Sequence, residues 1–160
     1  MSKKYNLQRL QKTVRNENDS IIENRHKKLF NALNIDLQNE SMDFEKQKAY
    51  IVMKYFDKNY QCLSDWQKSE IKQFTDFMEN IQSKDWETIK NTHGFGYTQY
   101  DLKKIKTSAK KYLTNIKNKI SEDINFFELR IDQKIRIHGF RANSAFFIVL
   151  LDKNHSVFPD

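Results

Sequence analysis

The period of the hydrophobic pattern changes near Phe126, and this change constrains the fold more than any other feature of the sequence. Between residues 102 and 120, apolar side chains recur at spacings of three and four, which predicts an amphipathic helix. Beyond Phe126 the period falls to two, because segments 128–132 and 134–138 alternate apolar and polar residues as half-buried strands do. The C-terminal part of the chain is therefore predicted to be a sheet that follows a helix.

The end of the chain completes the predicted antiparallel meander. Residues 142–144 can turn the chain, and residues 145–151 form a continuous apolar run. Such a run is typical of a central strand that is covered on both faces. A short last strand is predicted at 156–158.

Signals for one strand and two helices precede the amphipathic helix. Residues 50–56 are β-branched and aromatic and favour a strand, although none of them excludes a helix. Ser64 followed by Gln67 forms a capping-box pattern and predicts a helix that extends to Ile81. A second short helix is predicted from Ser83 to the glycine-containing segment 93–96. Strand, helices and meander together predict an α+β fold.

The first 40 residues differ from the rest of the chain. Their apolar residues recur at roughly helical spacing, but the apolar stripe is thin and the polar stretch 15–20 interrupts it. We predict an N-terminal helical extension over residues 1–45 and one α+β domain over residues 46–160, which suits a chain of 160 residues.

Missing motifs exclude several classes of function. Cys62 is the single cysteine, so the chain can build neither an intramolecular disulfide nor a cysteine-based zinc site. The histidines lack a closely spaced ligand pair, and no phosphate-binding glycine loop or catalytic-triad spacing is present, so we expect no metal and no cofactor. No apolar stretch reaches the roughly 18 residues of a membrane helix, and the N-terminus lacks the apolar core of a signal peptide. We expect a cytoplasmic protein that makes no contact with a membrane.

The positive charge of the chain is concentrated in one segment. The net charge is +7, yet outside residues 102–119 the basic and acidic side chains are equal in number. The segment contains seven lysines and no acid: Lys103, Lys104, Lys106, Lys110, Lys111, Lys117 and Lys119. Such a field attracts a polyanion such as RNA, although a solvated helix face has the same composition. Tyr97 and Tyr100 just precede it, where aromatic rings can stack on the bases of single-stranded RNA.

Three motifs mark the C-terminal part of the chain: FELR at 127–130, IRIHGF at 135–140 and DKNHSVF at 152–158. They resemble those of the RelE/ParE-like superfamily of bacterial toxins, many of which are ribosome-dependent mRNA endonucleases. The predicted order of strand, helices and meander from Tyr50 to Asp160 is similar as well. The sequence departs from the family pattern at Phe158, near the place where many such nucleases have a tyrosine.

The resemblance implies RNA cleavage without a metal, in which a base takes the proton of the 2′-hydroxyl, cations stabilise the phosphorane and an acid protonates the leaving oxygen. Strand alternation puts Arg136 and His138 on one face, and the preceding strand offers Arg130. We predict that these residues converge with further cations and with a second histidine. The predicted catalytic residues are Arg130, Lys134, Arg136, His138, Arg141 and His155. The alternative is a sheet face that is merely solvated.

Three functions remain open at this point. The first is a toxin-like endoribonuclease that cleaves mRNA on the ribosome and is silenced by an antitoxin protein, in a toxin–antitoxin or phage-defence setting. The second is a non-catalytic nucleic-acid-binding accessory protein, which the missing tyrosine at Phe158 favours. The third is a ParE-like protein that inhibits a host enzyme. The expected crowding of Arg, Lys and His on one sheet face favours the first over the third.

Overall fold

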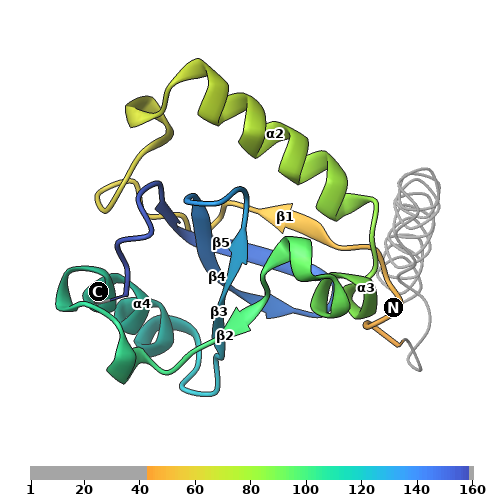
Figure 1. The fold of residues 1–160 in the computed structure, drawn as a ribbon. Coiled ribbons are helices and arrows are strands. Elements are labelled where there is room, and N and C mark those ends of the chain that lie inside the picture. Colours follow the sequence, from red (N-terminus) through yellow and green to blue (C-terminus); the bar gives the residue numbers. More distant parts are fainter. Residues whose placement is uncertain (1–42, 159–160) are drawn as a thin grey trace, which may run out of the picture. The chain divides into compact units, whose positions relative to one another are not determined.

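The computed structural model describes residues 43–158, which adopt an α+β fold (Figure 1). A five-stranded mixed sheet has hydrophobic cores on both of its faces. The α+β class predicted from the sequence is confirmed. The helices predicted within residues 1–40 lie outside the described residues.

The strands of the sheet are ordered β1-β5-β4-β3-β2. They are β1 (Tyr50–Val52), β2 (Thr98–Gln99), β3 (Phe126–Arg130), β4 (Arg136–Ala142) and β5 (Ala145–Asp152). β3, β4 and β5 form an antiparallel meander, β2 adds antiparallel to β3, and β1 runs parallel to β5. The meander, its turn at 142–144 and the burial of β5 on both faces were all predicted and are confirmed.

Three α-helices of residues 43–158 pack on this sheet. They are α2 (Lys68–Gln82), α3 (Trp86–Asn91) and α4 (Thr107–Ile120). Single 3₁₀ turns occur at Leu63–Asp65, His93–Phe95 and Leu102–Lys104. Figure 1 shows α2 on one side of the sheet and α4 on the other, and the two hydrophobic cores agree with this arrangement.

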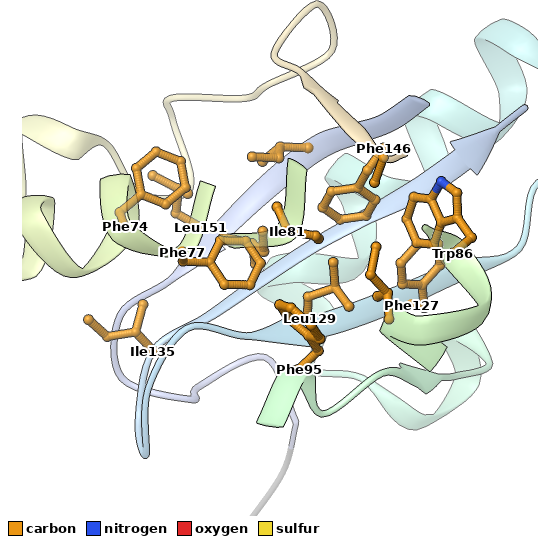
Figure 2. Close-up of a cluster of buried hydrophobic side chains, with 14 of the residues drawn as sticks. Phe74, Phe77, Ile81, Trp86, Phe95, Phe127, Leu129, Ile135, Phe146 and Leu151 are labelled. Carbon is orange, nitrogen blue, oxygen red and sulfur yellow. The ribbon is translucent and has the colours of Figure 1, made fainter. Parts of the chain in front are cut away.

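The core between the sheet and helices α2 and α3 is rich in aromatic rings. The helices contribute Phe74, Phe77, Ile81, Trp86 and Ile89, and the sheet contributes Phe127, Leu129, Ile137, Phe146, Ile148 and Leu151. Figure 2 shows Trp86, Phe127 and Phe146 gathered at one end of this core. Each aromatic side chain buries about 150–250 Å². Large rings thus supply the buried area that a polar chain, only 38% hydrophobic, otherwise lacks.

The second core lies under α4 and includes the end of the described chain. Its buried members are Ile105, Ala109, Leu113, Phe126, Phe140, Val149, Leu150 and Val157. The N–H of Lys106 donates to the carbonyl of Val157 at 2.9 Å, which ties the start of α4 to the C-terminal segment. The apolar face of α4 is therefore inside, and its lysines lie toward solvent.

A β-bulge between β4 and β5 determines which way the end of β5 faces. Gly139 pairs with Ile148 while His138 pairs with Leu150, so Val149 is the extra residue. A Cβ at Gly139 would lie 2.0 Å from the carbonyl oxygen of Phe147, so the strands approach closely only because this residue is glycine. Beyond the bulge the alternation of β5 is reversed, and Asp152 lies on the same face as His138.

The starts of α2 and α3 differ from the predicted ones because other residues cap them. α2 begins after Gln67, whose N–H donates to Glu70 Oε2 at 2.6 Å, whereas Ser64 lies in the preceding 3₁₀ turn. α3 begins after Asp85, whose carboxylate accepts the N–H of Thr88 at 2.7 Å. The predicted cap at Ser64 and the predicted helix start at Ser83 are therefore wrong.

Three other boundaries also need correction. α4 begins at Thr107 rather than at residue 102, because Asp101 caps a separate 3₁₀ turn by accepting the N–H of Lys103 at 2.8 Å. The strand predicted over 50–56 ends at Val52. Residues 156–158 form no strand, because the Asp152 carboxylate accepts their first two amide N–H groups and folds them into a turn.

Candidate functional site

Seven lysines lie in one segment, in the 3₁₀ turn Leu102–Lys104, in α4 and at the residue just before α4, and we call them the lysine surface. Its members are Lys103, Lys104, Lys106, Lys110, Lys111, Lys117 and Lys119, and each is exposed or half-buried. None of them forms an ion pair with any residue in 43–158. The Nζ of Lys111 lies 4.7 Å from the ring centroid of Tyr112. These cations are therefore available to an anionic partner.

An open pocket of about 550 Å³ lies beside the lysine surface. Its lining includes the side chains Tyr100, Leu102, Lys104, Lys117, Ile124 and Phe126. The prediction placed Tyr100 next to the lysines, and the structure brings them together in this pocket. Tyr97 was predicted there too, but its ring lies 4.7 Å from that of Phe127 and packs against the core under α2 and α3.

Tyr100 connects the pocket to a group of buried polar residues, which we call the polar cluster: Tyr100, Glu128, Arg136, His138, Asp152 and His155. His138 is fully buried. Its Nδ1 lies 3.1 Å from the hydroxyl of Tyr100, and its Nε2 lies 3.5 Å from Asp152 Oδ2. The second contact does not meet hydrogen-bond geometry, so we treat it as electrostatic.

The charge of Asp152 fixes the arrangement of protons around His138. Burial opposes ionisation of this carboxyl, but the imidazole of His138 and the amides of Ser156 and Val157 outweigh it and hold the pKa well below its ordinary value. Burial, followed by the charges of Glu128 and Asp152, raises the pKa of Tyr100 well above its ordinary value. We therefore assign a proton to Nε2 of His138, facing the Asp152 carboxylate. Its Nδ1 forms the hydrogen bond with the Tyr100 hydroxyl.

Glu128 and His155 form the solvent-facing side of the polar cluster. Glu128 is 8% exposed, and its Oε2 has no hydrogen-bond partner among the described residues. The Nε2 of His155, whose side chain is 44% exposed, lies 4.0 Å from that oxygen. Most buried polar atoms are hydrogen-bonded, so a buried carboxylate oxygen without a partner marks this edge as a candidate site.

The loop that holds His155 is built on Asp152. Its carboxylate accepts the N–H and hydroxyl of Ser156 at 2.7 and 2.9 Å and the N–H of Val157 at 2.9 Å. Within this loop His155 adopts a left-handed backbone conformation with φ 52. A non-glycine residue in this region carries strain that the surrounding contacts must hold, and such strain is frequent at functional sites.

Arg136 is placed for a structural role. Its guanidinium donates to the carbonyls of Asp132, Gln133 and Ile135 at 2.8, 3.3 and 3.1 Å. It is 5% exposed, and its Nε lies 4.0 Å from Glu128 Oε1. The donors predicted to bind a phosphate are thus used to close the turn between β3 and β4.

Three other predicted cations do not converge with His138. Arg141 donates to the carbonyl of Phe44 at 2.8 Å, pairs with Glu45 at 2.7 Å and lies 4.7 Å over the ring of Trp86. It is an odd number of positions from His138 along β4, so alternation turns it toward the opposite face, and its predicted convergence is wrong.

The remaining two cations are exposed around the β3–β4 turn. Lys134 lies in the turn itself, and Arg130 ends β3 against Gly96. Arg130 also lines a second open pocket, of about 360 Å³, together with Phe77 and Asp132.

Sequence reasoning missed two members of the site. They are Asp152 and Glu128, whose Oε2 has no hydrogen-bond partner among the described residues. One signal for Asp152 was available, because an acidic residue directly follows the uniformly apolar run 145–151. Within residues 43–158 no group of three or more His, Cys, Asp or Glu side chains is arranged to hold a metal ion. None of the helices in the same part of the chain has the length and hydrophobicity of a membrane span.

Comparisons with known proteins give no independent indication of function. No protein-family model matches the sequence. Neither the curated proteins nor the solved structures contain a significant match to it.

Proposed function

We propose that this chain binds single-stranded RNA through the lysine surface and the pocket beside it. The observation that carries the proposal is that seven lysines without ion pairs in the described residues lie in one segment, and that two of them, Lys104 and Lys117, line a pocket together with Tyr100. A cluster of unpaired cations neutralises phosphates and releases their counterions. Aromatic rings next to such a cluster can stack on unpaired bases.

The competing explanation is a solvated helix face, and it makes a different prediction. A merely solvated face has no reason to be continuous with an aromatic pocket, and it binds any polyanion by charge alone. Fluorescence anisotropy with a labelled single strand and a duplex of the same length distinguishes the two. We expect tighter binding of the single strand. Equal affinity for both, or no binding, would contradict the proposal.

A second candidate function is metal-independent cleavage of the bound RNA. Glu128 and His155, 4.0 Å apart at the solvent-facing side of the polar cluster, favour it. One of them can take the proton of a 2′-hydroxyl, whose oxygen attacks the adjacent phosphorus. The other can donate a proton to the 5′-oxygen as its bond to phosphorus breaks. The 3′ fragment then carries a free 5′-hydroxyl.

A more specific version of this second candidate function is that of a toxin with the RelE-like fold. β1 followed by α2 and α3, and then, after β2 and α4, the meander β3-β4-β5, supports it by the order of elements. The ring centroid of Phe158 lies 5.2 Å from that of Tyr100 and 6.3 Å from that of His155. Tyr100 therefore supplies a phenol hydroxyl next to Phe158, which has none. In this form the chain is a cytoplasmic mRNA-cleaving toxin that acts on the ribosome and is held inactive by an antitoxin, or serves in phage defence.

Cleavage is tested with purified protein, RNA and EDTA, followed by mapping of 5′ ends. We expect discrete cuts, and a loss of about 10²–10⁴ in rate for His155→Gln, the typical contribution of a general acid or base. His93→Gln, at an exposed histidine of the 3₁₀ turn His93–Phe95, is the matched control and should cleave normally. RNA bound but left intact would leave binding as the function. Growth arrest on induction without cuts would instead point to a protein inhibitor.

A further inference from the structure

The pocket beside the lysine surface has the size and lining of a site for a small planar group. Its volume of about 550 Å³ lies within the range of about 300–1,000 Å³ that ligand pockets occupy. Tyr100 and Ile124, both half-buried, give it apolar walls. Phe126 is only 1% exposed and is anchored in the core under α4, where its ring meets that of Phe140 edge-on with centroids 6.1 Å apart. The buried part of the lining is therefore preformed.

Two lysines from separate elements reach this pocket. Lys104 belongs to the 3₁₀ turn before α4, and Lys117 belongs to the last turn of α4. Neither has an acidic partner within residues 43–158. A planar group that carries phosphates on two sides matches this arrangement of charge.

Other side chains in the lining are polar and can form hydrogen bonds with the edge of such a planar group. Asp101 uses Oδ1 to cap the N–H of Lys103, which fixes the carboxylate and leaves Oδ2 for a ligand. Asn125 adds an exposed amide that can donate and accept. A fixed carboxylate selects a partner that presents N–H donors.

We infer that this pocket binds one unpaired RNA base that carries an exocyclic amino group, with its flanking phosphates on Lys104 and Lys117. The inference rests on the proposed RNA binding and specifies its sequence preference. Adenine, cytosine and guanine have such an amino group, and uracil does not. The base face packs on the apolar walls while its edge meets Asp101.

The test measures anisotropy with three labelled oligonucleotides: all uridine, the same with one central adenosine, and the same with an abasic site there. We expect the adenosine oligonucleotide to bind about tenfold more tightly than either of the others, because contacts to a stacked base are worth about that factor. Asn125→Trp, at an exposed residue of the lining, fills the pocket and should remove the difference. Asn91→Trp, at an exposed residue that ends α3 and lies outside the lining, is the matched control and should preserve it.

The outcomes separate this inference from the proposed function. Salt-dependent binding with equal affinity for all three oligonucleotides would overturn the base pocket and leave RNA binding intact. No binding of any oligonucleotide would remove the proposed function itself. The comparison on the unaltered chain decides the inference even if Asn125→Trp fails to fold.

Discussion

The hydroxyl of Tyr100 lies 3.1 Å from Nδ1 of the fully buried His138, while the ring of Tyr100 lines the pocket beside the lysine surface. One side chain thus contacts both the candidate RNA-binding pocket and the buried polar cluster. Its hydroxyl is the hydrogen-bond partner of His138 Nδ1, while Nε2 of the same ring faces the Asp152 carboxylate.

Tyr100→Phe separates these two roles. The variant keeps the ring in the pocket but leaves Nδ1 of His138 without a partner, which should lower the free energy of unfolding by about 1–3 kcal/mol. RNA affinity should stay within about twofold of the unaltered chain. Urea denaturation and anisotropy measure the two quantities. Tyr97→Phe is the control, since its hydroxyl has no hydrogen-bond partner in residues 43–158; an equal loss of stability in both variants would contradict the assignment.

Asp152 makes stability depend on pH. Its carboxyl has a lowered pKa in the folded chain, so its contribution is present above the unfolded-state pKa of about 3.9 and is lost as the pH falls through the lower, folded value. Asp152→Asn should cost about 3 kcal/mol at neutral pH through the lost charged hydrogen bonds. The difference in free energy of unfolding between this variant and the unaltered chain should become smaller below about pH 4.

Unfolding curves collected from pH 7 down to pH 3 test this dependence. Asp76→Asn, on the exposed face of α2, is the matched control and should stay within about 0.5 kcal/mol throughout. If the difference in free energy of unfolding between Asp152→Asn and the unaltered chain does not change with pH, the carboxylate charge has no role in stability.

A substitution at Gly139 tests the β-bulge that determines on which face Asp152 lies. Gly139→Ala puts a Cβ against the carbonyl of Phe147, at 2.0 Å without relaxation, and should lower the free energy of unfolding by about 3 kcal/mol or more. Gly94→Ala is the control, because the nearest atom there is 3.8 Å away. Comparable stability of the two variants in urea would refute the close approach of β4 and β5.

Arg136→Lys examines whether this residue serves the turn or a ligand. Lysine cannot donate to the three carbonyls that the guanidinium reaches, so the variant should lose about 2 kcal/mol of stability. RNA affinity, measured where the variant is folded, should not change. The control is Arg130→Lys, at an exposed residue without a hydrogen bond in the described residues, and it should be neutral. Normal stability together with weakened RNA binding would show that Arg136 belongs to the RNA-binding site.

The elements that were predicted correctly depend on local patterns. The alternation from Phe126 and the turn at Asn143 identify the meander, since its strands are joined by short connections. The helical spacing identifies α4 and places its lysines outside. β2 escaped prediction, because two residues carry no period, and the pairing of β1 with β5 joins segments far apart in sequence.

The candidate site escaped prediction for a related reason. Its key relationship, Asp152 on the face of His138, arises from the bulge at Val149, which a uniformly apolar strand does not reveal. The same alternation along β4 would have excluded Arg141 from that face. Arg136 was on the expected face, but only the fold shows that the carbonyls of the neighbouring turn already use its donors.

The salt dependence of RNA binding tests the central claim most directly. In the altered chain Lys103, Lys104, Lys110 and Lys111 are replaced by Gln; in the control Lys48, Lys68, Lys72 and Lys84, all exposed and outside the lysine surface, are replaced instead. Both lose the same charge. The account predicts that the log–log slope of affinity for single-stranded RNA falls by about 0.7 per lost phosphate contact in the first chain and stays unchanged in the control. Equal slopes for the two chains would contradict it.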